Sequence, residues 1–512
     1  MLLASVSAVP LNVAAAQHDK VDATVRQQAA AHPGDVPVLI TRRSSSGALQ
    51  TLNTHHAKVK QQLKIGNIVA ASVASAELEA IAADPDVVRI AYDAPTHLTS
   101  ASPDPLTMTS NLKSVFPIAV QASQAWNAPN PIRGTGVGIA VIDSGIDTGH
   151  NDFYGSLFSG PNAATRISML WGFYNGGLSA LADDNGHGTW VSGIAAGRGW
   201  SWATNTTEGQ YIGIAPDARL VSIKVTDRDG QSHVSDVMAA LQWAVDNQAV
   251  YNIRVINLSL VSDVAESYTT SSLDAAVEMA WLHGIAVVVA AGNSGPNTLQ
   301  YAPANDPFVI TVGATDDLGT ASTADDRLTS WSSYGSTQDG FAKPELVAPG
   351  RHIVGTLSSG SVTLATQYPN NIVDSHKLYI QLSGTSASAP IVTGLVADLL
   401  QSRPTLKPDD VKGLFMQTAL PIPGIGTGAG YPQLMNAATS QATINRANVN
   451  VVPNNYIASA GCATLPTGTD CSQTNWSSVS WNSVSWNSVS WNSVSWNSVS
   501  WNSVSWNSVS GN

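Results

Sequence analysis

The chain has 512 residues, of which 43 % are apolar and 12 % are charged, and its formal net charge is −12. This length exceeds what one core of ordinary size needs, so several structural units are expected, and the apolar share argues against a disordered chain. The charged share is about half of the usual ~25 %, which is typical of many exported proteins, and the lack of a Lys/Arg cluster argues against nucleic acid as a partner.

The N-terminal segment has the character of a targeting sequence. Residues 1–16 are apolar and end in the Ala-x-Ala pattern Ala14-Ala15-Ala16, although no Lys or Arg occurs before Lys20. Residues 1–20 therefore resemble an atypical or truncated secretory signal peptide. No later run of about 18 apolar residues predicts a membrane-spanning helix, so the sequence favours a secreted protein.

Residues 21–100 are expected to form a first unit, a small α+β sandwich in which short strands and helices alternate. The patterns predict strands at 38–40, 68–73 and 87–92 and helices at 57–64 and 75–82, the second of them capped by Ser75. Residues 101–110 are rich in Ser, Thr and Pro, which is typical of a linker or a processing site.

Residues 111–445 are expected to form the largest unit. Short, almost wholly apolar runs predict strands at 137–142, 220–225, 255–258 and 285–290. Segments 234–247 and 272–283, which separate some of these runs, are predicted to be helical. Strands that are apolar on both faces are typical of a parallel, doubly wound α/β sheet, in which the active site gathers at the C-terminal ends of the strands.

The C-terminal part divides into two segments. Residues 446–475 are expected to be a linker in which Cys462 and Cys471 close a small disulfide loop, and no His or further Cys lies at the spacing of a zinc site. Residues 476–512 repeat Trp-Asn-Ser-Val-Ser with a period that fits neither a helix nor a strand. This tail is either an unstructured low-complexity segment or an element for surface contact, secretion or self-association.

Three polar residues stand at the end of a predicted strand or the start of a predicted helix. Asp143 ends the run Ala140-Val141-Ile142, His187 lies in Asp184-Asn185-Gly186-His187-Gly188-Thr189, and Ser386 lies in Ser383-Gly384-Thr385-Ser386-Ala387. Each has a structural alternative when taken alone: a loop or cap residue for Asp143, a structural histidine for His187 and a helix N-cap for Ser386.

Together, these three segments resemble the signature motifs of the subtilisin family of serine peptidases, in the family's order of Asp, His and Ser. The resemblance implies a secreted serine endopeptidase in which Ser386 is the nucleophile, His187 its general base and Asp143 the group that orients the imidazole. The resemblance also implies that this peptidase needs no cofactor for catalysis and that its partners are protein or peptide substrates.

Further segments extend the resemblance to the substrate cleft. Asn293, in Ala290-Ala291-Gly292-Asn293-Ser294-Gly295-Pro296, corresponds to the oxyanion-hole segment, with a simple turn as the alternative. The backbone stretches that flank the substrate correspond to Leu258, Ser259, Leu260, Ala290, Ala291 and Gly292. Their apolar walls imply a preference for a large apolar side chain before the scissile bond.

The first unit and Asp152 carry two further implications of the resemblance. The first unit resembles the inhibitory prodomain of these enzymes, which implies autocleavage between about Thr96 and Ser110. Asp152 corresponds to a ligand of structural calcium in many relatives, but the loop after the His motif does not match, and the alternative is an exposed Asp after a turn.

The sequence also allows two alternatives to the peptidase. An esterase of the α/β-hydrolase type is disfavoured because no G-x-S-x-G elbow surrounds Ser386 and the order of its triad differs. The other alternative is a secreted surface-binding protein on an inactive peptidase scaffold, with the tryptophan tail as its working part.

Overall fold

The computed structural model divides the chain into two compact units, residues 1–101 and 102–512, which are described separately below. It describes residues 20–31, 34–44, 46–63, 68–92, 112–155, 165–172, 182–200, 207, 209–232, 234–263, 265–360 and 362–460. The expected signal peptide, the linker 101–110, the Cys462–Cys471 pair and the repeat tail 476–512 lie almost entirely outside these residues.

The N-terminal unit is an antiparallel sheet with helices and a core of its own. Its strands are β1 (Asp35–Arg42), β2 (Lys58–Leu63), β3 (Ile68–Ala74) and β4 (Val87–Tyr92), in the order β2-β3-β1-β4. Its helices are α1 (Ala23–Ala31), α2 (Leu49–Thr54) and α3 (Leu78–Ala82), the last preceded by the 3₁₀ turn η2 (Ser75–Glu77). Val38, Ile40 and Ile90 are fully buried in its core, so the unit has the packing of a small independent fold.

Two predictions for this unit are wrong. Residues 57–64 were expected to be a helix, but Lys58–Leu63 form the edge strand β2, which pairs with β3. Lys and Gln favour helices only weakly, and pairing with a neighbouring strand outweighs that preference. Ser75 is also not a helix cap, because it is the first residue of the 3₁₀ turn and the capping position is Ala74.

The larger unit is built on an eight-stranded sheet in the order β11-β10-β9-β8-β5-β7-β6, with β14 also paired to β10. Its pairings are parallel except for β10–β11, which confirms the doubly wound α/β sheet. The strands are β5 (Gly138–Asp143), β6 (Ile167–Gly172), β7 (Arg219–Lys224), β8 (Ile253–Leu258), β9 (Ala286–Ala290), β10 (Ile310–Asp316), β11 (Arg327–Leu328) and β14 (Leu346–Pro349). All six residues of β5 are buried, because helices cover both faces of the sheet.

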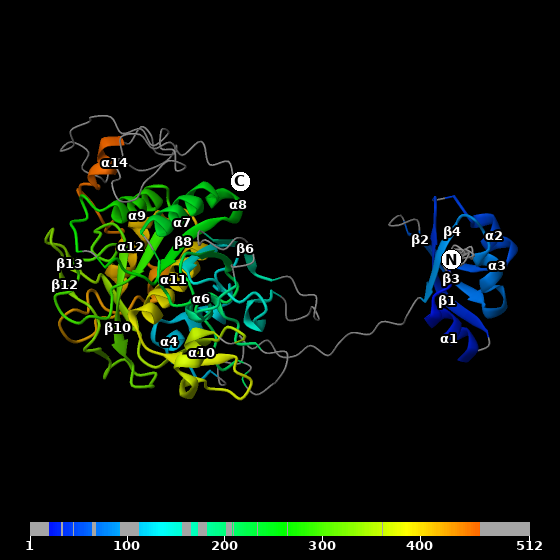
Figure 1. Ribbon diagram of the computed structural model, residues 1–512, viewed down its shortest axis with the longest axis horizontal. Coiled ribbons are helices and arrows are strands. Elements are labelled where there is room, and N and C mark those ends of the chain that lie inside the picture. The colour runs from blue at the N-terminus through cyan, green and yellow to red at the C-terminus, as the bar shows by residue number, and fades with distance from the viewer. Residues whose placement is uncertain are drawn as a thin grey trace, which may run out of the picture. The chain divides into compact units, whose positions relative to one another are not determined.

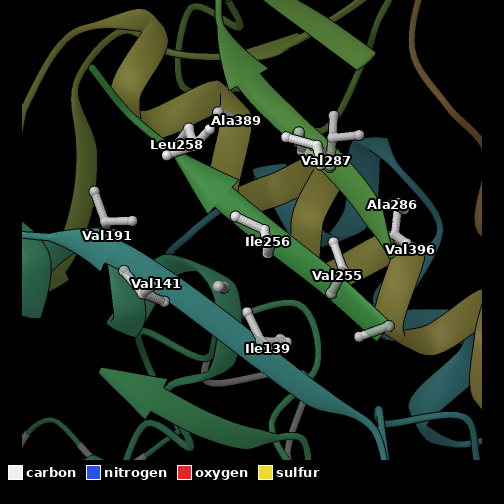
Figure 2. Close-up of a cluster of buried hydrophobic side chains, with 14 of the residues drawn as sticks. Ile139, Val141, Val191, Val255, Ile256, Leu258, Ala286, Val287, Ala389 and Val396 are labelled. Carbon is white, nitrogen blue, oxygen red and sulfur yellow. The ribbon is translucent and has the colours of Figure 1, made fainter. Parts of the chain in front are cut away.

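The principal helices form two layers around this sheet (Figure 1). Helices α6 (His187–Ala196) and α11 (Thr385–Ser402) pack against each other, and α7 (Val234–Asp246) packs against α9 (Ser272–Leu282). Figure 2 shows side chains of β5, β8 and β9 in the core together with Val191 of α6 and Val396 of α11. This core fixes the strand ends and the two helix starts that carry the candidate site residues.

Shorter elements complete the unit around this core. They are α4 (Phe116–Ala119), α5 (Ala122–Trp126), η5 (Asn151–Phe153), α8 (Gln248–Tyr251), β12 (Gly335–Ser336), β13 (Ala342–Lys343), β15 (Ile353–Thr356), α10 (Thr363–Gln367), η7 (Pro369–Asn371), β16 (Tyr379–Leu382), α12 (Pro408–Thr418), α13 (Leu434–Thr439) and α14 (Asn455–Ala460).

The first part of the expected linker 446–475 belongs to this fold. Helix α14 packs against α9, and Ile457 is 1 % exposed. The backbone N–H of the buried Asn454 donates to Glu278 Oε2 at 2.8 Å. A buried apolar anchor and a buried polar contact hold this segment in place, which the polar composition of the region did not indicate.

Three carboxyl groups meet in the interior beneath α14. Asp274 and Glu278 lie one turn apart on α9, Asp306 hydrogen-bonds to Glu278, and all three are 0 % exposed. Burial raises the pKa of Asp274 and Glu278 well above the ordinary range and that of Asp306 to about 7. The folded protein therefore holds protons here that the unfolded chain releases near pH 4.

The stability of the protein is expected to fall as the pH rises from about 4 through about 7, because the folded state then binds more protons than the unfolded state. Glu278→Gln keeps a hydrogen-bond donor but cannot ionise, so its melting temperature should fall less steeply between pH 5 and pH 8. At pH 8 it should exceed that of the parent by about 2 °C or more, as expected for 1–3 kcal/mol at a buried charge. Thermal unfolding followed at each pH tests this.

The exposed Asp229 offers a matched control for that measurement, and Asp229→Asn should follow the parent at every pH. Equal slopes for Glu278→Gln and the parent would show that these carboxyls do not set the pH dependence of stability.

Candidate active site

The carboxylate and imidazole predicted to act together lie in direct contact. Asp143 is the last residue of β5 and is 5 % exposed, and His187 is the first residue of α6. His187 Nδ1 lies 2.8 Å from Asp143 Oδ1 and 3.0 Å from Oδ2. Asp143 Oδ1 also accepts the backbone N–H of Ser144 at 2.7 Å, which fixes the orientation of the carboxylate.

The electrostatic surroundings favour the protonated form of His187. Burial lowers the pKa of His187, but the negative charge and hydrogen bond of Asp143 and the charge of Asp183 outweigh it, so the pKa is raised above its ordinary 6.5. An imidazole held in this way can accept a proton and carry the resulting positive charge next to Asp143.

Ser386 is the second residue of α11, where free backbone N–H groups favour developing negative charge. Its side chain is half-buried, and its carbonyl oxygen accepts the hydroxyl of Ser259 at 3.5 Å. Ser259 and His187 line the same hollow, so the structure brings the start of α11 to the side of the Asp143–His187 pair.

Asn293 follows β9 and is tied to the first residue of α11. Its Oδ1 accepts both the backbone N–H of Thr385, at 2.9 Å, and the Thr385 hydroxyl, at 3.0 Å. Two donors on that atom identify it as the oxygen and turn the amide nitrogen toward Gly384. A Cβ placed on Gly384 would lie 3.6 Å from Asn293 Nδ2 and 3.7 Å from Ser386 N, so both nitrogens lie close to the same position.

A hollow of about 250 Å³ lies beside the imidazole. It is lined by Asp143, Ser144, Asn185, His187, Thr226, Gly230, Ser259, Leu260 and Val261. Val261 lines this hollow with an apolar side chain, and the residue is 45 % exposed. Among the described residues that line it, Asp143 and His187 are the titratable ones.

The residues expected at the substrate cleft differ in how far their side chains are exposed. Ser259, Leu260 and Gly292 are half-buried and lie near the catalytic groups. Leu258, Ala290 and Ala291 are buried, and Leu258 lies in the core of the sheet (Figure 2). These three residues can therefore reach a substrate through their backbone but not through their side chains.

Asp152 does not have the surroundings of a calcium ligand. It is fully buried in η5, so the alternative of an exposed Asp is wrong. Its carboxylate accepts the backbone N–H of Trp200 at 2.7 Å and the hydroxyl of Tyr379 at 3.0 Å, which point hydrogens at the oxygens a cation would need. The described residues contain no group of three or more His, Cys, Asp or Glu placed to hold a metal.

Sequence reasoning missed the residues that support this site. Thr385 holds Asn293, and the buried Ser144 and Asp183 link the end of β5 to the start of α6. The only signal was their position next to the motif residues, and buried polar side chains beside a strand end require partners.

Comparison with known proteins gives a consistent result. Residues 134–456, which include every residue of the candidate site, match the model of the Subtilase family. Serine protease AprX of Bacillus subtilis (strain 168) is 34 % identical over 316 residues, which cover 60 % of this chain and 67 % of AprX. Thermitase of Thermoactinomyces vulgaris is 33 % identical over 311 residues, which cover 61 % of this chain and 90 % of thermitase.

A solved structure of a cold-adapted subtilisin-like serine proteinase is 27 % identical, with a TM-score of 0.43, and the match covers 59 % of this chain and 89 % of that chain. Within the residues that the structure describes, no helix combines the length and apolarity needed to cross a membrane. The family match and the curated relatives together show that the chain belongs to the subtilase family and is a serine-type endopeptidase.

Proposed function

We propose that this enzyme hydrolyses peptide bonds through an acyl-enzyme formed on Ser386. The observation that carries the proposal is the 2.8 Å contact between His187 Nδ1 and Asp143, which lies beside the start of α11. Because Nδ1–H donates to the carboxylate, Nε2 is left unprotonated and can act as a base.

His187 Nε2 takes the proton of the Ser386 hydroxyl as Oγ attacks the carbonyl carbon of the scissile bond. The tetrahedral intermediate collapses when His187 gives that proton to the leaving amine, which leaves the acyl group on Ser386. A water molecule then attacks the ester in the same manner and releases the second product. Asp143 keeps the proton of the neutral imidazole on Nδ1 and stabilises the positive charge that forms in each step.

The negative charge on the intermediate's oxygen is placed between Asn293 Nδ2 and Ser386 N. This assignment is supported by the closeness of both nitrogens to Gly384, which carries no side chain that could block access to them. Donors fixed before the reaction need no reorientation as charge develops, which is why such sites lower the barrier.

The proposal is tested by covalent labelling with a fluorophosphonate, which reacts with activated serines. We expect one adduct per chain, located at Ser386 by peptide mass mapping, and a parallel loss of casein hydrolysis. His187→Ala should slow labelling strongly because it removes the base. An enzyme that neither hydrolyses denatured casein nor takes up the label would instead favour the inactive surface-binding scaffold, for which the comparisons provide no support.

Asn293→Ala is expected to lower kcat by about 100- to 1000-fold with little change in KM, a magnitude found for the corresponding donor in a subtilisin. The reason is that Nδ2 stabilises charge that exists only in the transition state. Thr385→Val, which removes one contact of Asn293 but leaves Nδ2 in place, should lose far less. Steady-state kinetics on a peptide anilide measure both, and equal losses in the two variants would contradict the assignment.

The preferred residue before the scissile bond is proposed to be large and apolar. Support comes from the lack of charged side chains in the stretches Leu258–Leu260 and Ala290–Gly292, which would flank the substrate. A charged side chain entering these stretches would lose its hydration without gaining a partner.

The enzyme is further proposed to be secreted as a zymogen. The apolar segment ending in Ala14-Ala15-Ala16 supports export, and the separate core of residues 21–92 supports a prodomain that folds as its own unit. Chain mass followed during activation should then show release of this unit in the wild type and its retention in Ser386→Ala.

A further inference from the structure

A second carboxylate lies buried behind the Asp143–His187 pair. Asp183 is 3 % exposed and accepts four hydrogen bonds. Its Oδ1 accepts the Ser144 hydroxyl at 2.8 Å and the backbone N–H of Gly186 at 2.7 Å. Its Oδ2 accepts the backbone N–H of Thr189 at 2.8 Å and the Thr189 hydroxyl at 2.5 Å.

These contacts tie the helix that carries His187 to the strand that carries Asp143. Gly186, at the N-cap of α6, has no side chain to satisfy the first free N–H groups, so Asp183 caps Thr189 and Ser144 Oγ caps Gly188 at 2.8 Å. The approach is close, since a Cβ on Gly188 would lie 2.1 Å from the carbonyl oxygen of Gly145. One carboxylate thus sets the distance between the two catalytic side chains.

The contacts of Asp183 fit its ionised form. Burial raises the pKa of Asp183, and the four donors oppose that rise. The Ser144 hydroxyl already accepts Gly188 N and the Thr189 hydroxyl accepts Asp147 N, so each has its own proton left for Asp183. All four neighbours therefore donate, and a carboxylate satisfies them without a proton of its own.

Among the described residues, the other charged side chains on the elements packed against α6 donate no hydrogen bond to Asp183. The elements that pack against α6 carry Asp143, Asp152, Arg219, Lys224 and Asp398. Lys224 donates to Ser144 O at 2.7 Å and to Asp184 Oδ1 at 2.6 Å, so the carboxylate of Asp184 compensates its positive charge. The carboxylates of Asp143 and Asp183 are the ones that raise the pKa of His187.

We propose that Asp183 is a positioning residue for catalysis, which acts through Ser144 and the start of α6 to hold His187 against Asp143 and to stabilise its protonated form. The proposal rests on the proposed function of the Asp143–His187–Ser386 set. Asp183 then has two effects that can be tested separately. Its hydrogen bonds position His187, and its negative charge stabilises the protonated form of His187.

Two variants separate these effects. Asp183→Asn removes the charge and two acceptor sites, so kcat should fall about 10- to 100-fold with KM nearly unchanged, as expected for a misplaced catalytic group. The acid limb of its kcat/KM profile should move to lower pH, because the imidazolium loses a stabilising charge. Ser144→Ala breaks the bridge but keeps the charge, so kcat should fall without that downward shift.

An NMR titration of His187 in a Ser386→Ala background measures the same effects of geometry and charge without relying on enzyme activity. Asp183→Asn should lower the pKa of His187 and weaken the downfield Nδ1 proton signal, whereas Ser144→Ala should affect that signal alone. If Asp183→Asn does not fold, the Ser144→Ala signal still decides the geometric part. Unchanged kcat with an unchanged His187 titration in Asp183→Asn overturns the proposal, as does a lower melting temperature with no shift in that titration.

The NMR titration also distinguishes failure of the proposed peptidase function from failure of the positioning role of Asp183. If wild-type enzyme hydrolysed no peptide while Asp183→Asn still shifted His187, the proposed function would fail and the positioning role would stand.

Discussion

Ser386→Ala is expected to lower kcat on a peptide substrate by roughly 10⁶-fold, the magnitude known for loss of this nucleophile in a relative. The substitution removes the atom that we propose forms the acyl-enzyme but leaves the fold intact, because Ser386 is only half-buried and its backbone contacts remain. Residual catalysis over water would come from the oxyanion donors and from substrate binding. The measurement is initial-rate hydrolysis of denatured casein and of a peptide anilide, with chain mass followed in parallel.

The same helix offers a control for this substitution. Ser402, at the other end of α11, donates its hydroxyl to Leu399 O within the helix, so Ser402→Ala should keep wild-type activity. Ser386→Ala with activity within tenfold of the wild type would show that another nucleophile does the chemistry.

Asp143→Asn is expected to lower kcat/KM by about 10⁴-fold at neutral pH. Asp143 Oδ1 accepts both Ser144 N and His187 Nδ1, and Oδ2 lies 3.0 Å from the same imidazole nitrogen. An amide nitrogen in place of Oδ2 donates toward Nδ1 and favours the tautomer whose proton sits on Nε2, which cannot accept the serine proton. The positive charge on His187 also loses its partner, so its pKa should fall.

A pH profile of kcat/KM separates this effect from a general loss of structure. The acid limb of Asp143→Asn should move to lower pH while the melting temperature stays near that of the wild type. Asp229→Asn, an exposed substitution beside the same hollow, should leave the profile unchanged. An Asp143→Asn variant with the wild-type profile would contradict the role given to this carboxylate.

The sequence alone predicted the central sheet correctly. The apolar runs ending near Asp143, Leu258 and Ala290 became β5, β8 and β9, because strands covered on both faces leave a continuous apolar signature. The family resemblance, read from the three motifs, predicted the serine endopeptidase that the comparisons confirm.

Local pattern failed where contact with another segment decided the outcome. The sequence of Lys58–Leu63 predicts a helix, but the segment pairs with β3 as a strand. Residues 455–460 are predicted to belong to a linker, but they form a helix that packs on α9. Asp152 reads as an exposed turn residue, yet Trp200 and Tyr379 enclose its carboxylate. For Lys58–Leu63 the partner strand follows directly, and strand pairing outweighs the helix preference of single residues. For residues 455–460 and Asp152 the partners lie far along the chain, so no local window contains the information.

The sequence by itself determined the apolar strands and the family to which the chain belongs, and it predicted which residues would carry the chemistry, because strand ends and helix starts are local features that their own neighbours specify. Only the tertiary structure decided how those residues are held. Asp183 caps α6 and binds Ser144, 39 positions away, and Thr385 fixes the amide of Asn293, 92 positions away. Such contacts depend on the distance and direction of buried polar atoms, which only the packed sheet and helices bring together.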